Sequence, residues 1–206
     1  MKKLFQFLKR VWRKLLGKPT AAVDPFAELE AKGLKIAESS KAIMHSPWGI
    51  DRTFPWLIEI GEGCLISTNV MIMAHDASTA LPIGYTKIGR VSIGNHVFIG
   101  HNSTVLCGVT IGDNVIIGAN SLVNKDLASN GVYGGNPAKY ICSFEEYRDK
   151  RRKEFERSPC SEKNWIYWSR KASLDDKTRL FDQMGPSGVA YLKSDVDALD
   201  LESGDQ

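Results

Sequence analysis

Residues 93–128 repeat a six-residue pattern of hydrophobic and polar positions without a gap. Each hexad opens on Ile or Val, and its fifth place holds a mostly small or branched side chain. The opening residues are Ile93, Ile99, Val105, Ile111, Ile117 and Val123, and the fifth-place residues are Val97, Ser103, Val109, Val115, Ser121 and Leu127. A period of six fits neither a helix nor an alternating strand. It predicts a triangular solenoid, in which three hexads form an 18-residue coil and successive coils stack into one core.

The same register occurs upstream, where Ile60, Ile66 and Ile72 open three further hexads. The frame then breaks for the 15 residues between Ala77 and Ile93. Pro and Gly within this stretch favour an excursion out of the coil. We therefore predict an all-β solenoid over residues 58–141, with a loop at 76–87.

The flanking regions predict less regular structure. Within residues 19–57, the stretch 25–34 predicts a short helix that ends at Gly33, and strand-like pieces at 34–37 and 41–44 suggest incomplete first coils. Residues 142–193 form a predicted C-terminal helical extension, with an exposed helix over 143–158. The acidic tail, residues 194–206, is expected to be disordered.

Residues 1–18 predict a basic amphipathic helix. Leu, Phe, Val and Trp residues lie at helical spacing, opposite seven Lys and Arg residues. Two interpretations fit: a helix lying on an anionic membrane surface, or a helix packed on a neighbouring subunit. The rest of the chain has no apolar run near the ~20 residues of a membrane span. We expect a cytoplasmic protein with reduced cysteines, peripheral at the inner face of a bacterial membrane under the first interpretation, and no nucleic-acid partner.

Residues 58–141 resemble the hexapeptide-repeat acyltransferases, and within them the sugar and polysaccharide O-acetyltransferases related to galactoside and maltose acetyltransferases. The resemblance lies in IEIGEGCLISTNVMIMAHDAS and in the closing order of hexads, a Lys-Asp pair and GNPAK. It implies a left-handed parallel β-helix. It also implies a homotrimer that binds acetyl-CoA in clefts between subunits and acetylates a sugar or glycan acceptor.

Acetyl transfer from a thioester to a sugar hydroxyl needs a base, and histidine is the natural one. The chain has four histidines: His45, His75, His96 and His101. His75 lies where the frame breaks, and it matches the family's catalytic histidine, so we predict it to be the general base of a direct transfer. His45 and His96 are interpreted as solvated turn residues. Asp76 either orients the imidazole, binds acceptor hydroxyls or simply begins the loop.

The resemblance also implies a donor site without a metal. Lys125 and Lys139 match phosphate-contacting positions, although an exposed lysine is more often a solvated charge. The remaining donor-side residues are Phe98 in place of a common Trp, Asn124 in place of a common Thr, His101, and the small corner residues Gly100, Gly118 and Ala119. Cys142 replaces a basic residue, which leaves one phosphate contact in doubt.

The acceptor site is expected to lie between the 48–56 segment and the 78–86 loop. Asp51, Trp56, Asp76 and Tyr85 are the residues assigned to it. Aromatic faces suit sugar rings, but the sequence does not indicate which sugar is bound.

Three alternatives stay open. An amino-sugar N-acetyltransferase needs the same site, because one sequence does not separate amine from hydroxyl acceptors. A γ-type carbonic anhydrase shares the solenoid and binds zinc through three histidines; His96 and His101 have the required spacing, but the third position is Leu106. A non-catalytic trimeric scaffold is the third alternative.

Overall fold

The computed structural model describes residues 24–44, 47–164 and 170–194. It contains two compact units, Met1–Phe144 and Glu145–Gln206. The predicted basic helix at 1–18 lies outside the described residues, as does the predicted acidic tail apart from Ser194. No helix in the described ranges is long and apolar enough to cross a membrane.

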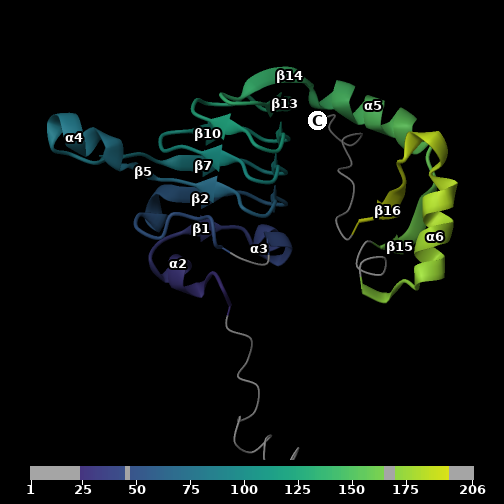
Figure 1. Cartoon of the computed structure of the whole chain (residues 1–206). Helices are drawn as coiled ribbons and strands as arrows, with labels where there is room; N and C mark the ends of the chain where they lie inside the picture. The colour runs from purple at the N-terminus through teal and green to yellow at the C-terminus, as the bar shows by residue number, and fades with distance from the viewer. Residues whose placement is uncertain (1–23, 45–46, 165–169, 195–206) are drawn as a thin grey trace, which may run out of the picture. The chain divides into compact units, whose positions relative to one another are not determined.

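Unit 1 is dominated by short strands (Figure 1). It begins with helix α2 (Ala27–Ala31), strand β1 (Lys35–Ile36), helix α3 (Glu38–Met44) and the 3-10 turn η1 (Pro55–Leu57). The coil strands are β2 (Ile58–Ile60), β3 (Leu65–Ile66), β4 (Met71–Ile72), β7 (Val91–Ile93), β8 (Phe98–Ile99), β9 (Thr104–Val105), β10 (Thr110–Ile111), β11 (Ile116–Ile117) and β12 (Leu122–Val123). Strands β13 (Gly131–Gly134) and β14 (Lys139–Ser143) close the stack.

The strands form three sheets, one for each side of a triangular prism. Their orders are β1-β2-β7-β10, β4-β9-β12 and β3-β8-β11-β13, the last extended by the antiparallel strand β14. Ile93 lies opposite Ile111, and Ile99 opposite Ile117. The opening residues of hexads one coil apart therefore stack on each other, as predicted. These pairings confirm a parallel β-solenoid. The left-handed winding stays a prediction.

The core consists of the predicted hexad positions. Ile99, Ile117 and Val123 are fully buried, and so is Cys64 at a fifth place. Two fifth places hold buried serines, whose hydroxyls both donate to the carbonyl of Gly118. These polar groups are therefore satisfied within the core.

The fourth place of many hexads forms a corner with left-handed backbone. Asn69, Asn102 and Asn120 have φ of 62°, 60° and 57°, a region that Asn tolerates better than most residues. Their side-chain amides hydrogen-bond in series at 2.7 and 2.8 Å. The corners are thus fixed both by backbone conformation and by a side-chain ladder.

Two of the predicted leading elements are confirmed and one is wrong. Helix α2 ends before Gly33, and β1 pairs with β2, so the solenoid begins before residue 58. Residues 41–44 are helical instead of strand-like. Helix α3 contacts β3, Ser40 is fully buried with its hydroxyl on the Gly61 carbonyl, and Lys41 lies 2.9 Å from Glu30. These contacts outweigh the local strand preference and hold a helix over the coil.

Unit 2 contains helix α5 (Phe144–Phe155, which starts at the last residue of unit 1), strand β15 (Cys160–Asn164), helix α6 (Leu174–Gln183), the 3-10 turn η4 (Gly185–Ser187) and strand β16 (Tyr191–Lys193). Helix α5 has no buried residue, as predicted for an exposed helix. Strands β15 and β16 are parallel, and the rings of Phe155 and Tyr191 pack edge to face at 5.3 Å. A capping box between Ser173 and Asp176 starts α6.

Candidate active site

His75 occupies a corner position where the chain leaves the solenoid. Ile72 pairs with Val105, so His75 is in register with Gly108 of the next coil. Gly108 turns the corner with φ of 86°, whereas His75 begins the extended strand β5 (His75–Asp76). After η2 (Ala77–Thr79) and α4 (Ala80–Ile83), strand β6 (Lys87–Ile88) returns antiparallel to β5. We call residues 76–88 the arm; it projects from the coil stack (Figure 1).

The imidazole of His75 is held by Asp51. Its Nδ1 lies 2.5 Å from Asp51 Oδ2. The Asp51 side chain is 2% exposed, whereas that of His75 is 26% exposed. Because an ionised carboxylate only accepts hydrogen bonds, Nδ1 carries the proton and Nε2 is free to accept another. His75 and Asp51, which we call the dyad, thus have the form of a general base with its orienting acid.

The Asp51 carboxylate is ionised in the folded protein. Burial by itself raises the pKa of Asp51, but the hydrogen bonds that it accepts from His75 and from the backbone N–H groups of Thr53, Ala74 and Phe54 lower it below its ordinary value overall. The 2.8 Å bond from Thr53 and the 2.9 Å bond from Ala74 also fix both oxygens in place. A buried negative charge is therefore maintained beside the imidazole.

Asp51 reaches His75 because residues 47–56, which we call the strap, run beside β4. The amide of Ile72 donates to the Gly49 carbonyl at 2.8 Å, and the Asp51 amide donates to the Ile72 carbonyl at 2.9 Å. A Cβ atom at Gly49 would lie 1.6 Å from the Val70 carbonyl oxygen. Only glycine allows this approach. Gly49 was not predicted as a site residue. Its only signal in the sequence is a glycine directly before Ile50 and Asp51.

An aromatic wall flanks the dyad. The Phe54 ring lies 5.3 Å from the His75 ring and 5.4 Å from the Trp56 ring, measured between centroids. Trp56 is 54% exposed, so the predicted acceptor residue presents a free surface near the dyad. Phe54 was not predicted as a site residue; it lies between the two.

The two predicted aspartates have different hydrogen-bond partners. Asp76 accepts from the Ser78 amide at 2.9 Å, and this contact together with the Ser78 hydroxyl lowers its pKa. Asp76 therefore starts the arm, while Asp51 orients the imidazole. Asp51, expected in the acceptor site, lies beside His75, and both of its carboxylate oxygens already accept hydrogen bonds from the protein. Tyr85 is exposed on the arm.

The predicted donor residues divide between two edges of the prism, and one group lies away from the edge of His75. Gly100, His101, Gly118 and Ala119 follow β8 and β11 at the Asn-ladder corner, where His101 Nδ1 lies 2.8 Å from Thr68 Oγ1. Phe98 is 39% exposed on the outer face of β8.

The two lysines and Asn124 are exposed. Lys125 and Asn124 follow β12 on the same edge as His75, because Val123 pairs with Val105. Lys139 begins β14 in another sheet, where it pairs with Gly134 of β13, and Gly134 is in register with Gly118. Lys139 therefore lies at the glycine corner, and within one chain only Lys125 and Asn124 share the edge of His75.

The two histidines of the zinc alternative lie at successive corners. His96 is exposed with φ of 55°, the turn position expected for it. Within the part of the chain that the structure describes, no group of three metal-ligating side chains gathers. The His101 ring contacts Thr68, and residue 106 is a leucine.

Comparison with known proteins places this geometry in context. Residues 90–125 match the family described as bacterial transferase hexapeptide (six repeats). Protein CapG of Staphylococcus aureus is 50% identical over 100 residues, which cover 47% of this chain and 58% of the relative. The putative acetyltransferase YvoF of Bacillus subtilis is 38% identical over 119 residues, covering 58% of this chain and 65% of the relative.

Among solved structures, a maltose O-acetyltransferase from Clostridium difficile 630 is 22% identical, with a TM-score of 0.44, over 67% of this chain and 84% of that one. The chain spans less than two thirds of the length of CapG and YvoF. The similarity of the repeat segment to hexapeptide-repeat acetyltransferases, inferred from the residues, is confirmed.

Proposed function

We propose that this protein transfers an acetyl group from acetyl-CoA to a hydroxyl of a sugar or of a surface-polysaccharide precursor. The observation that carries the proposal is the dyad of a buried, ionised Asp51 and a partly exposed His75 at the break in the repeat. Such a pair activates a weak nucleophile. The acetyltransferase name of the YvoF relative supports the donor group.

The reaction proceeds by direct transfer in a ternary complex. His75 Nε2 accepts the proton of the acceptor hydroxyl while the oxygen of that hydroxyl attacks the thioester carbonyl carbon. The tetrahedral intermediate then collapses, breaking the carbon–sulfur bond, and the thiolate takes the proton back from the imidazolium. The products are an acetyl ester and free CoA. Asp51 stabilises the transient imidazolium, as the aspartate does in a catalytic triad.

The edge that carries His75 offers a direction for the donor. Lys125 lies two coils along that edge, roughly 10 Å away at one strand spacing per coil. A donor with its thioester at His75 and its phosphates at Lys125 would run along the solenoid axis, and Lys139, at the glycine corner, would reach it from a neighbouring subunit. Asn124 would hydrogen-bond to it on the way.

A homotrimer would complete the site. The glycine corner at Gly100, Gly118 and Ala119, together with Phe98 and His101, lies on another edge of the same prism. A neighbouring subunit can bring its own glycine corner opposite the dyad, which places the pantetheine arm in a cleft between subunits. A left-handed winding is proposed with it, on the strength of the family resemblance.

Residues 1–18 extend the proposal to location. Their seven basic residues suit an anionic membrane, and three helices on one trimer would bind together more firmly than one. Deleting residues 1–18 should release the protein from anionic vesicles at moderate salt and leave acetyl transfer to a soluble acceptor fragment intact. Dissociation of the truncated protein into monomers would show that this segment is a subunit contact instead.

A thiol-release assay with acetyl-CoA and a panel of sugars and nucleotide-sugars tests the proposed reaction. Wild-type protein should release CoA only with an acceptor present. The His75→Ala protein should release little CoA even with the acceptor present. Hydroxylamine treatment of the product separates the two acceptor classes, because it cleaves an acetyl ester and leaves an acetamide intact. A resistant product would identify an amino-sugar N-acetyltransferase, and absence of release with every acceptor would contradict the proposal.

A further inference from the structure

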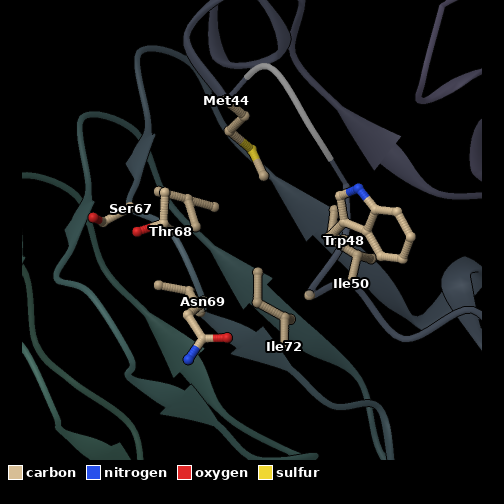
Figure 2. Close-up of a pocket in the computed structure, with 10 residues that line it drawn as sticks. Met44, Trp48, Ile50, Ser67, Thr68, Asn69 and Ile72 are labelled. Atoms are coloured by element: carbon tan, nitrogen blue, oxygen red, sulfur yellow. The ribbon is translucent and has the colours of Figure 1, made fainter.

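A second concave site lies in unit 1, beside the beginning of the strap. It is a pocket of about 220 Å³. Met44, Ile50 and Ile72 form its apolar part, Trp48 stands at one side, and Ser67, Thr68 and Asn69 form the opposite rim (Figure 2). None of the residues that line it belongs to the His75–Asp51 pair, and its rim residue Thr68 adjoins His101 at the glycine corner.

Trp48 is the most unusual member of this pocket. Its side chain is 88% exposed, although its neighbour Gly49 is tightly fixed against Val70. An indole that exposes most of its surface is an unfavourable use of apolar surface unless something packs against it. The geometry therefore favours a ligand with one apolar face.

The rim supplies oriented, uncharged hydrogen-bonding groups. Thr68 is held by His101 at 2.8 Å, and Asn69 donates its amide to Asn102 at 2.7 Å, which leaves the Asn69 side-chain oxygen as an acceptor. None of the described residues that line the pocket carries a charge. An anionic or cationic ligand would lack a partner here, and a plain hydrocarbon chain would cover the hydroxyls without bonding them.

A pyranose ring meets both requirements, because one face carries C–H groups and its edge carries hydroxyls. The pocket is smaller than the roughly 300–1,000 Å³ of sites that enclose a whole drug-sized ligand, so it takes about one ring. Ile50 of the pocket and Asp51 of the dyad are adjacent on the strap. A ring bound at Trp48 would consequently be held at a constant spacing from the reacting hydroxyl.

We propose that the Trp48 pocket binds one neutral sugar ring of an oligosaccharide acceptor, remote from the ring that is acetylated at His75. This inference rests on the proposed function for its link to catalysis. It predicts that the acceptor is a chain of at least two sugars. The enzyme should prefer longer acceptors to single sugars through a lower KM and not through a higher kcat. Binding energy at a remote ring stabilises the ground state and the transition state alike.

The test separates binding from catalysis. Calorimetric titration of the His75→Ala protein with neutral trisaccharides built from glucose, galactose or N-acetylglucosamine measures binding without turnover. At least one should bind, and Trp48→Ala in the same background should weaken it about tenfold, whereas Trp48→Phe should retain most of the affinity. Phe181→Ala, which removes another largely exposed aromatic ring, in unit 2, is the matched control and should change nothing.

Kinetics with the wild-type protein complete the test. The KM for the bound trisaccharide should be lower than that for its monosaccharide, and Trp48→Ala should remove most of this difference. Trisaccharide binding that is unaffected by Trp48→Ala, or no binding at millimolar concentration by any of the three, overturns the pocket assignment even if monosaccharides are acetylated. Trp48-dependent binding without any acetyl transfer supports the pocket and contradicts the proposed function instead.

Discussion

The same corner of the solenoid is built three times, and only one copy carries the proposed catalytic base. His75, Gly108 and Asp126 occupy equivalent places in successive coils. Gly108 makes a tight left-handed turn, and Asp126 closes the next corner by accepting from the Thr110 amide at 2.7 Å. His75 instead begins strand β5, and there the chain leaves as the arm. The repeat thus builds the frame, and its interruption exposes the side chain that we propose as the base.

The largest expected effect comes from removing the group that distinguishes the His75 corner. His75→Ala should lower kcat by roughly 10²- to 10⁴-fold, the usual contribution of a positioned base. The proposed trimer should stay assembled, because the side chain is not part of the core. Steady-state thiol release together with sedimentation measures both, and unchanged turnover would exclude His75 as the base.

Asp51→Asn should have the next largest effect. We expect kcat to fall by roughly 10- to 10³-fold, because the imidazole remains but loses the anion that orients it and stabilises its charged form. The lowered pKa of Asp51 also has a consequence for stability. A carboxylate whose pKa is lowered on folding stabilises the folded state above the ordinary value of about 3.9 and loses this contribution as the pH falls through the folded value.

Thermal unfolding between pH 3 and 7 checks that consequence. The wild type should lose its stability advantage over Asp51→Asn as the solution is acidified. A difference in Tm that stays constant over this range would mean that the carboxylate does not titrate as described.

Gly49→Ala tests whether backbone fit holds the dyad together. The added methyl group would collide with the Val70 carbonyl, so the strap must shift. We expect a loss of about 1–3 kcal/mol in the free energy of unfolding, together with reduced kcat. Arg52→Ala is the control on the same strap; it removes only a half-exposed ion pair with Glu28 and should cost less than about 1 kcal/mol. Equal effects of both variants would contradict the fit argument.

Lys125→Ala and Lys139→Ala should act on donor binding alone. Each should raise the KM for acetyl-CoA about two- to tenfold with little change in kcat, as expected for lost uniform binding. A short acetyl thioester without the nucleotide serves as the control substrate. Equal losses with this substrate would indicate misfolding instead of a missing phosphate contact.

Gly108→Ala should give the smallest effect and sharpen the comparison. No atom lies within 4 Å of the added carbon, so the cost comes only from the left-handed backbone at φ of 86°, about 1–2 kcal/mol. Chemical denaturation measures this loss. Activity per folded molecule should be unchanged, and a large fall in kcat would mean that this corner also takes part in the reaction.

The outward side chains of two of the sheets were not predictable from the hexad repeat. On sheet β1-β2-β7-β10, the outward row is Lys35, Glu59, Ser92 and Thr110, whereas on sheet β3-β8-β11-β13 it is Leu65, Phe98, Ile116 and Val132. The hexad pattern specifies only the inward side chains, so it places no constraint on either row.

The sequence by itself determined the solenoid, its register and the place where it breaks. Ile93 lies opposite Ile111, and His75 marks the departure of the arm, because a strict period fixes which side chains face the core and each coil pairs with the next. Only the tertiary structure decided that Asp51, 24 residues earlier, orients His75, and that residues 41–44 are helical. Those outcomes depend on how an aperiodic strap and helix pack on the coil, through contacts such as that of Gly49 with Val70, and no local pattern encodes them.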